Sequence, residues 1–336
     1  MGELLELLSK EEREHVQETS MPEWMDPMLA QLTKDYFSDP GWIFERKLDG
    51  ERCLAFCRGD QVQLKSRNQQ DLNIQYPEVV EILEEQDVDH LIADGEIVAF
   101  DGNITSFARL QDRMHVEDPE EARQTGISVF YYLFDLLYID EYDITQVGLR
   151  HRKSILKRVM TFDDPLRLVA HRNEEGESFF NEACQKGWEG VIAKQADSPY
   201  LHSRSQKWLK FKCVNRQEFV IGGYTDPHGK RIGFGALLLG YYDGDDLRYA
   251  GKVGTGFDED SLQHLGDRLS SLERENKPFA DGDISSDEVH WVEPQLVAQI
   301  GFEEWTDYDK LRQPRFQGLR QDKAPEDVVR EEPHHE

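Results

Sequence analysis

The residues of this chain best suited to covalent chemistry are Lys47, Asp49 and Gly50, in the sequence Lys47-Leu48-Asp49-Gly50. A neutral lysine amine can attack the α-phosphate of a nucleotide and form a phosphoramidate. A free lysine has a pKa of about 10.4, so neighbouring cations or a metal ion must lower that pKa for the attack. The reaction also needs carboxylates for a divalent metal, an aromatic face for the base, and cations for the leaving pyrophosphate.

Short segments along the chain supply each of these groups. Two carboxylates lie beside glycines, in Asp94-Gly95-Glu96 and Glu189-Gly190, and Phe134 lies in an aromatic run. Each segment alone has an ordinary structural explanation, such as a turn acid, a core phenylalanine or a solvated strand edge. Taken together, they supply a nucleophile, metal carboxylates, a platform for a base and the cations Arg52, Arg67, Lys210, Lys212, Arg320 and Lys323.

Alternating apolar patterns predict the elements that must position these residues. Residues 53–57 and 61–65 are typical of a hairpin that turns at Gly59-Asp60. Residues 76–85 and 149–160 have helical spacing, and the second of these helices is basic. Strands are predicted at 91–100, interrupted at 94–96, and at 129–139, 190–194 and 207–213. On the last strand, Lys210 and Lys212 are two residues apart and face the same way.

The chain after residue 215 has a different pattern. Short strands at 219–224, 236–242 and 247–253 are separated by glycine and aspartate turns. One helix near 258–276 follows, and the segments 292–302 and 311–320 complete a small β-rich unit. About five strands with one helix favour a small closed barrel, an OB-fold.

Composition narrows the class of protein. The 336 residues leave room for about two domains, and no apolar run approaches the ~20 residues of a membrane span. The N-terminus is acidic and unlike a signal peptide, which predicts a cytoplasmic protein. The four cysteines, at 53, 57, 184 and 213, are expected to be reduced and mostly buried.

The net charge is −28, from 67 acidic and 39 basic residues. A merely soluble acidic protein is one explanation. The even spread of acids favours another, adaptation to molar intracellular salt. Such a charge ordinarily argues against a nucleic-acid partner. That objection weakens at molar salt, where the Debye length falls to about 3 Å.

The order of these segments resembles that of the ATP-dependent DNA ligases, most closely the ligase module of bacterial LigD end-joining proteins and their stand-alone relatives. The resemblance covers roughly residues 26–324. Seven ordered motifs carry it: Lys47-Leu48-Asp49-Gly50, Ser66-Arg67-Asn68, Asp94-Gly95-Glu96, Tyr131-Tyr132-Leu133-Phe134-Asp135, Glu189-Gly190-Val191-Ile192-Ala193-Lys194, Trp208-Leu209-Lys210-Phe211-Lys212 and Arg320-Gln321-Asp322-Lys323.

The resemblance implies a role for each matching residue. Lys47 would form lysyl-AMP, Asp49 would help to activate the transfer, and Gly50 would allow close approach to the nucleotide. The residues implied in nucleotide or phosphate binding are Glu45, Arg52, Arg67, Glu96, Phe134 as the adenine platform, and Lys194, Lys210 and Lys212 at the α-phosphate. Glu96 and Glu189 would hold Mg²⁺ or Mn²⁺. Arg320, Asp322 and Lys323 would orient the leaving pyrophosphate.

The resemblance also implies an α+β fold in which a nucleotidyltransferase (adenylation) domain precedes an OB-fold domain. We expect an acidic, helical leader at 1–20, the adenylation domain at 21–215, the OB-fold at 216–324 and an acidic tail at 325–336. The implied substrates are ATP and nicked duplex DNA, bound by a monomer, with Ku-like or LigD polymerase-type proteins as partners. An mRNA guanylyltransferase, an RNA ligase and a non-catalytic nucleic-acid-binding subunit are the alternatives.

Overall fold

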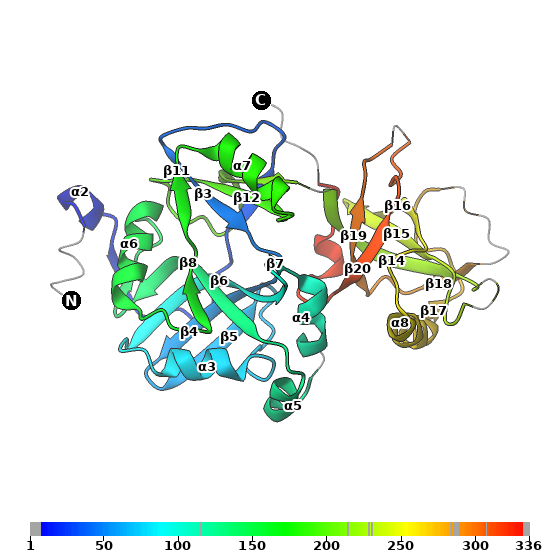
Figure 1. Ribbon diagram of the computed structural model, residues 1–336, viewed down its shortest axis with the longest axis horizontal. Helices are drawn as coiled ribbons and strands as arrows, with labels where there is room; N and C mark the ends of the chain where they lie inside the picture. The colour runs from blue at the N-terminus through cyan, green and yellow to red at the C-terminus, as the bar shows by residue number, and fades with distance from the viewer. Residues whose placement is uncertain are drawn as a thin grey trace. The chain divides into compact units, whose positions relative to one another are not determined.

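The structure is a computed structural model that describes residues 8–114, 116–213, 215–227, 229, 231–282, 284, 289–306 and 308–331. The chain divides after Cys213 into two compact units, and each is treated by itself (Figure 1). Among the described helices, none is long and apolar enough to cross a membrane.

The first unit contains two sheets. The eight-stranded sheet has the order β1-β9-β8-β6-β4-β5, with β10 beside β8 and β7 beside β6. Its strands are β1 (Gln17–Glu18), β4 (Glu51–Arg58), β5 (Gln61–Ser66), β6 (His90–Asp101), β7 (Ile104–Thr105), β8 (Val129–Ile139), β9 (Tyr142–Asp143) and β10 (Leu166–Leu168). The five-stranded sheet, in the order β11-β3-β12-β13-β2, comprises β2 (Leu29–Leu32), β3 (Trp42–Lys47), β11 (His171–Asn173), β12 (Gly190–Gln195) and β13 (Arg204–Lys212).

An apolar cluster lies between these sheets and joins them. It contains Leu54 and Phe56 from β4, Phe134 and Leu137 from β8, and Trp208 from β13. Helices cover the outer faces: α3 (Pro77–Glu84), α4 (Phe107–Met114) and α6 (Leu149–Val159) pack on the eight-stranded sheet, and α7 (Gly176–Gln185) packs on the five-stranded sheet (Figure 1). The short α5 (Pro119–Gln124) follows α4. The unit therefore has a layered architecture, with two sheets packed through this cluster and helices on their outer faces.

The hairpin predicted at Gly59-Asp60 is present, with Arg58 paired to Gln61 and Gly59 at a φ of +57°. The strand predicted at 91–100 is β6, and it runs through Asp94-Gly95-Glu96 without a break. A bulge against β8 between Asp94 and Gly95 takes up the irregularity instead. Adding a Cβ to Gly95 would place it 2.6 Å from the backbone oxygen of Tyr132, so this glycine serves the close packing of two strands.

The prediction of a helical leader at 1–20 is wrong for the described residues. Only α2 (Lys10–Arg13) is helical, with Ser9 as its N-cap. Leu8 is buried in the core, and β1 pairs antiparallel with β9. The Glu12 carboxylate accepts a 3.0 Å hydrogen bond from the backbone N–H of Gly148. Apolar burial and strand pairing outweigh local helix propensity here, so this segment packs as part of the first unit.

The second unit is a β-barrel of the OB-fold type with one helix. Its long β14 (Asn215–Thr225) pairs with β15 (Leu237–Asp243) along one edge. Along the other it pairs first with β19 (Val297–Phe302) and then with β18 (Val289–Val292). The remaining elements are β16 (Asp246–Val253), α8 (Glu259–Ser271), β17 (Glu273–Arg274), β20 (Arg315–Arg320) and the 3₁₀ turn η1 (Pro325–Asp327). A capping box between Asp258 and Ser261 fixes the start of α8.

The cysteine prediction is only half right. Cys53 and Cys57 are free and buried, as predicted. Cys184 and Cys213 instead form a disulfide, with their Cα atoms 5.2 Å apart. No spacing motif marks this pair, because the two residues meet only when α7 folds over the end of β13. The bond joins the helix that covers the five-stranded sheet to the last residue of the first unit.

We expect loss of this disulfide to destabilise the first unit by about 3–4 kcal/mol, because it closes a loop of 29 residues. Denaturant unfolding of the wild type with and without dithiothreitol measures the effect. The matched control is the C184S/C213S double variant, which should unfold like the reduced wild type and not respond to dithiothreitol. Equal stability of the oxidised and reduced wild type would contradict the expectation.

Candidate active site

Strand register gathers the predicted lysines on one face of the five-stranded sheet. On β3 and β12, Lys47 pairs with Gly190, and Gly190 in turn pairs with Lys212 on β13. Two residues further along, Glu45, Ile192 and Lys210 are aligned in the same way. Since side chains alternate along a strand, Lys47, Lys210 and Lys212 share the face that points toward the other sheet.

Lys47 forms an ion pair with Glu189, at 2.6 Å between Nζ and Oε1. Burial lowers the pKa of Lys47, but Glu189, Glu96 and Asp49 raise it more, so the pKa lies above its ordinary value. This differs from the expectation that cations lower the pKa of Lys47. In the protein alone the nearest charge is a carboxylate, which holds the lysine in its protonated form.

The other oxygen of Glu189, Oε2, is buried and has no hydrogen-bond partner among the described residues. A buried carboxylate oxygen without a partner is unfavourable unless a ligand completes it, and a divalent metal fits this position. The described part of the chain contains no group of three or more His, Cys, Asp or Glu residues able to hold a metal. The donor set therefore suits Mg²⁺ held by one or two carboxylates together with nucleotide phosphates and water.

Gly50 serves strand packing at the start of β4. A Cβ at this position would lie 2.2 Å from the backbone oxygen of Ile97 on β6. The close contact is therefore with the protein backbone, which explains the glycine without the expected approach to the nucleotide. The backbone N–H of the adjacent Asp49 donates to Thr105 Oγ1 at 3.1 Å, which fixes the turn between Lys47 and β4.

Arg52 is held rigidly on β4 beside the aromatic residue Phe134. Its guanidinium forms two 2.6 Å hydrogen bonds with the Asp94 carboxylate and lies 4.7 Å from the centre of the Phe134 ring. The Tyr200 hydroxyl also donates to Asp94, at 2.6 Å. Glu96 lies directly opposite Arg52 in the register of β4 and β6, and Arg67 follows the end of β5.

Lys194, predicted at the α-phosphate, is a buried residue of β12 beside Phe134 and Glu45. Its side chain is only 2% exposed, forms a 2.6 Å ion pair with Glu45, and has its Nζ 4.0 Å from the centre of the Phe134 ring. Burial lowers the pKa of Lys194 to about 8. Phe134 is itself 8% exposed and packs edge-on against Trp208. Lys194 therefore belongs to the aromatic end of the cleft, together with Phe134 and Glu45.

Sequence reasoning missed two basic residues of α6 that support this end of the cleft. Lys153 forms a buried ion pair with Glu45 and donates to the backbone oxygen of Val169 at 3.2 Å. Arg152 is fully buried and forms hydrogen bonds of 2.7 and 2.8 Å with Asp135. Both are in the helix predicted as basic, but a basic helix is ordinarily solvated, so its composition gave no sign of inward-facing charges.

The predicted charged motif of the second unit lies at the end of β20. Arg320 forms hydrogen bonds of 2.7 and 2.6 Å with Asp322, and Lys323 forms a 3.0 Å ion pair with Glu218. Asp322 is buried, and the two basic side chains are mostly covered. The motif is thus an ordered cluster within its own unit.

A lysine at the end of a strand in one of two packed sheets, followed by an OB-fold unit, is the architecture of the covalent nucleotidyltransferases. Residues 27–212 match the family model described as the ATP dependent DNA ligase domain, and residues 230–323 match the ATP dependent DNA ligase C terminal region. The chain belongs to the ATP-dependent DNA ligase family.

Relatives and solved structures agree with this membership. The multifunctional non-homologous end joining protein LigD of Pseudomonas aeruginosa is 38% identical over 94% of this chain, which spans 38% of that protein. DNA ligase 2 of Haloquadratum walsbyi is 32% identical over 90% of this chain and is matched over 50% of its own length. A structure of mycobacterial DNA ligase D complexed with ATP and MES has a TM-score of 0.65 and 33% identity, covering 91% of this chain and 98% of that one.

We expect Phe134→Ala to raise the KM for ATP and also to destabilise the protein by about 3–5 kcal/mol, because the ring is buried. Loss of stacking alone would account for about 1–3 kcal/mol of nucleotide affinity. Phe134→Leu is the matched control, because it fills most of the same space without an aromatic face. A platform role requires the leucine variant to raise KM while its melting temperature stays near that of the wild type. An unchanged KM in a stable leucine variant would show that the ring is core alone.

Proposed function

We propose that this protein is an ATP-dependent DNA ligase that seals nicks with a 5′-phosphate and a 3′-hydroxyl in duplex DNA. The observation that carries the proposal is the set of Lys47, Lys210 and Lys212 on one sheet face, with Glu189 2.6 Å from the Lys47 amine. Family membership adds that the nucleotide is ATP.

The proposed reaction has three steps. The deprotonated Lys47 amine attacks the α-phosphorus of ATP, so a P–N bond forms and pyrophosphate leaves. The 5′-phosphate oxygen of the nick then attacks the lysyl-AMP, which transfers AMP to the DNA and frees Lys47. Finally the 3′-hydroxyl attacks the activated 5′-phosphorus, forming the phosphodiester and releasing AMP.

The first step requires the Lys47–Glu189 ion pair to be broken, because Glu189 stabilises the protonated amine. We propose that Glu189, with Glu96, binds Mg²⁺ or Mn²⁺ through the Glu189 oxygen that has no partner in the part of the chain that the structure describes. A bound metal supplies positive charge that offsets charge developing on the phosphates. Lys210 and Lys212 then bind the α-phosphate, Arg52 and Arg67 contact the ribose and phosphates, and Asp49 assists the transfer.

For Lys194 the geometry supports a role at the base, together with Glu45 and Phe134, because its amine lies over the aromatic rings. For the second unit we propose that Arg320, Asp322 and Lys323 orient the pyrophosphate in the first step only. Their side chains would have to exchange their present partners, Glu218 among them, for phosphate oxygens.

The LigD relatives are named as end-joining proteins, and this chain covers 38% of one of them. We propose a repair role, with end joining as its setting and Ku-like or LigD polymerase-type proteins as partners of a monomeric, cytoplasmic ligase. We also propose the domain boundaries predicted at residues 215 and 324, while the boundary predicted at residue 20 separates a segment that packs with the first unit.

Lys47→Ala should abolish the covalent enzyme–AMP adduct and nick sealing with ATP, since no amine remains to be adenylylated. It should still join some pre-adenylylated nicks, because the last step does not use Lys47 as a nucleophile. Denaturing gels after incubation with labelled ATP, GTP and NAD measure the adduct and its donor. An acid-labile adduct in the alanine variant would refute the assignment of Lys47. A wild-type adduct with GTP alone would refute the ligase proposal.

We propose that the net charge of −28 is an adaptation to high salt. The salt dependence of nick sealing and of thermal stability tests this proposal. For an ordinary basic DNA-binding protein, log affinity falls with log salt at a slope near −0.9 per phosphate contact. Here screening of the acidic surface should flatten or invert that slope at first. Nick sealing and thermal unfolding are measured from about 0.05 M to molar KCl. A steady loss of activity and no gain in stability would contradict the halophilic proposal alone.

A further inference from the structure

A second hollow lies on the opposite face of the five-stranded sheet from Lys47. It has a volume of about 710 Å³, within the usual range for small-molecule sites. Leu209 and Lys207 on β13 line it, while Trp208 and Lys210, which alternate with them, face the catalytic cleft. On β3 it is lined by Trp42, five residues or about 16 Å along the strand from Lys47.

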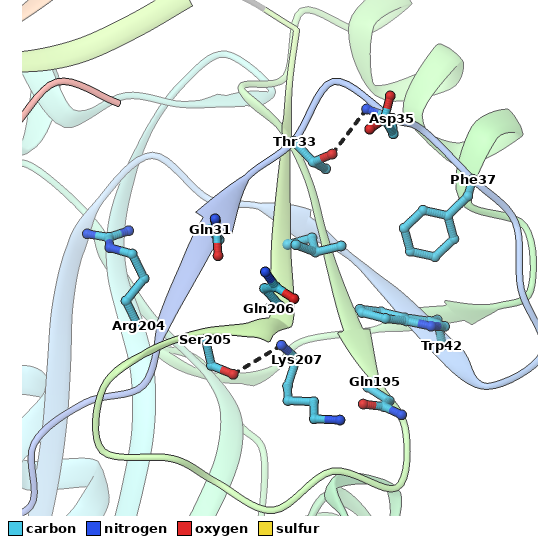
Figure 2. A pocket seen from close by; sticks show the side chains of 11 residues that line it. Gln31, Thr33, Asp35, Phe37, Trp42, Gln195, Arg204, Ser205, Gln206 and Lys207 are labelled. Atoms are coloured by element: carbon cyan, nitrogen blue, oxygen red, sulfur yellow. Dashed lines mark hydrogen bonds between the residues drawn. The ribbon is translucent and has the colours of Figure 1, made fainter. Parts of the chain in front are cut away.

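Two aromatic rings form one side of this hollow. Trp42 and Phe37 meet edge to face with their ring centres 5.0 Å apart, and both are only partly buried (Figure 2). In Figure 2, Arg204 and Gln31 lie on the other side, with Lys207 and Gln195 below. A packed aromatic wall beside an open space offers a surface on which a planar group can lie.

The polar groups around the hollow are of two kinds. Arg204 and Lys207 are exposed cations, and Arg204 is fixed by a 2.8 Å hydrogen bond to the backbone oxygen of Ala30. Asp35 and the amides of Gln31, Gln195 and Gln206 add acceptors and donors. The lining thus has two positive charges and one negative charge, the reverse of the balance of the whole chain.

We propose that this hollow binds one unpaired nucleotide of a DNA end, with its base against Trp42 and its phosphate on Arg204 and Lys207. Every base has a face that stacks on an aromatic ring, and single-stranded sites combine such rings with cations along the backbone. The Asp35 carboxylate accepts hydrogen bonds from the exocyclic amino groups of cytosine, adenine or guanine, which thymine lacks. An acidic peptide would match the cations but would leave no use for Asp35.

The site is separate from the catalytic cleft and extends the proposed ligase function, on which it rests, to substrates with single-stranded ends. A nick has no unpaired base, whereas a broken end with an overhang does. An overhang held on the back of the sheet would keep such an end on the enzyme without occupying the face that carries Lys47.

The test uses three fluorescent ligands at high salt: a single-stranded octamer of deoxycytidylate (dC8), one of thymidylate (dT8) and a nicked duplex. Binding of each is measured for the wild type, Lys207→Glu and Trp42→Ala. The control is Lys157→Glu, which changes the same charge at an exposed position of α6 on the same unit. We expect the wild type to bind dC8 at least about fivefold more tightly than dT8. Both hollow variants should weaken dC8 binding by about fivefold or more, with nicked-duplex binding and adenylylation by ATP unchanged. Lys157→Glu should leave dC8 binding, nicked-duplex binding and adenylylation at their wild-type values.

Three results would overturn the proposal. The first is wild-type dC8 binding by Lys207→Glu together with normal adenylylation. The second is equal weakening of nicked-duplex and dC8 binding by Lys207→Glu, which would indicate a general charge effect. The third is Lys207-dependent binding of a hexaglutamate peptide in place of dC8, which would assign the hollow to an acidic peptide. Failure of the ligase proposal is distinguishable, since it would show as absent adenylylation in the wild type. If Trp42→Ala does not fold, the Lys207→Glu result decides.

Discussion

The first unit depends on a set of buried carboxylates that are each paired with a buried or half-buried cation. Asp94 is paired with Arg52, Asp135 with Arg152, and Glu45 with both Lys153 and Lys194. Removing one member of such a pair typically costs 3–5 kcal/mol, because the other is left uncompensated. The pairs of Arg152 and Lys153 connect α6 to both sheets, and the Arg52–Asp94 pair joins two neighbouring strands, so the packing of the unit and its buried charges are set by the same contacts.

Glu189 is also paired with a cation, Lys47, but it differs from these carboxylates in one respect. One of its oxygens binds the Lys47 amine and the other has no partner among the described residues. Glu189 therefore stabilises the protonated form of Lys47 in the protein alone, while its second oxygen is left without a partner among the described residues. Under the proposed function, the same carboxylate would bind the divalent metal and release the Lys47 amine when nucleotide is bound. Glu45, Asp94 and Asp135 are each paired with a cation of the protein. They therefore compete little with Glu189 for a divalent ion.

The sequence predicted the strands that carry Phe134, Lys210 and Lys212, because alternation and aromatic runs are local signals. It also predicted that Lys210 and Lys212 share a face, since a period of two needs no tertiary information. That Lys47 shares this face depends on the pairing of β3 with β12 and could not be predicted locally. The sequence could not predict that Lys194 would turn to the aromatic end of the cleft, because its partner Glu45 lies on a different strand. Arg152, Lys153 and the Cys184–Cys213 bond were missed for the same reason, as each depends on the packing of a helix against a sheet.

The position of the disulfide also has a mechanical meaning. Cys213 is the residue at which the chain leaves the first unit, and it is bonded there to α7. Any pull transmitted along the backbone from the second unit meets this anchor before it reaches β13. The bond to α7 therefore shares such a force with the hydrogen bonds that hold Lys210 and Lys212 opposite Ile192 and Gly190. The cross-link thereby supports the end of the strand that carries these two lysines.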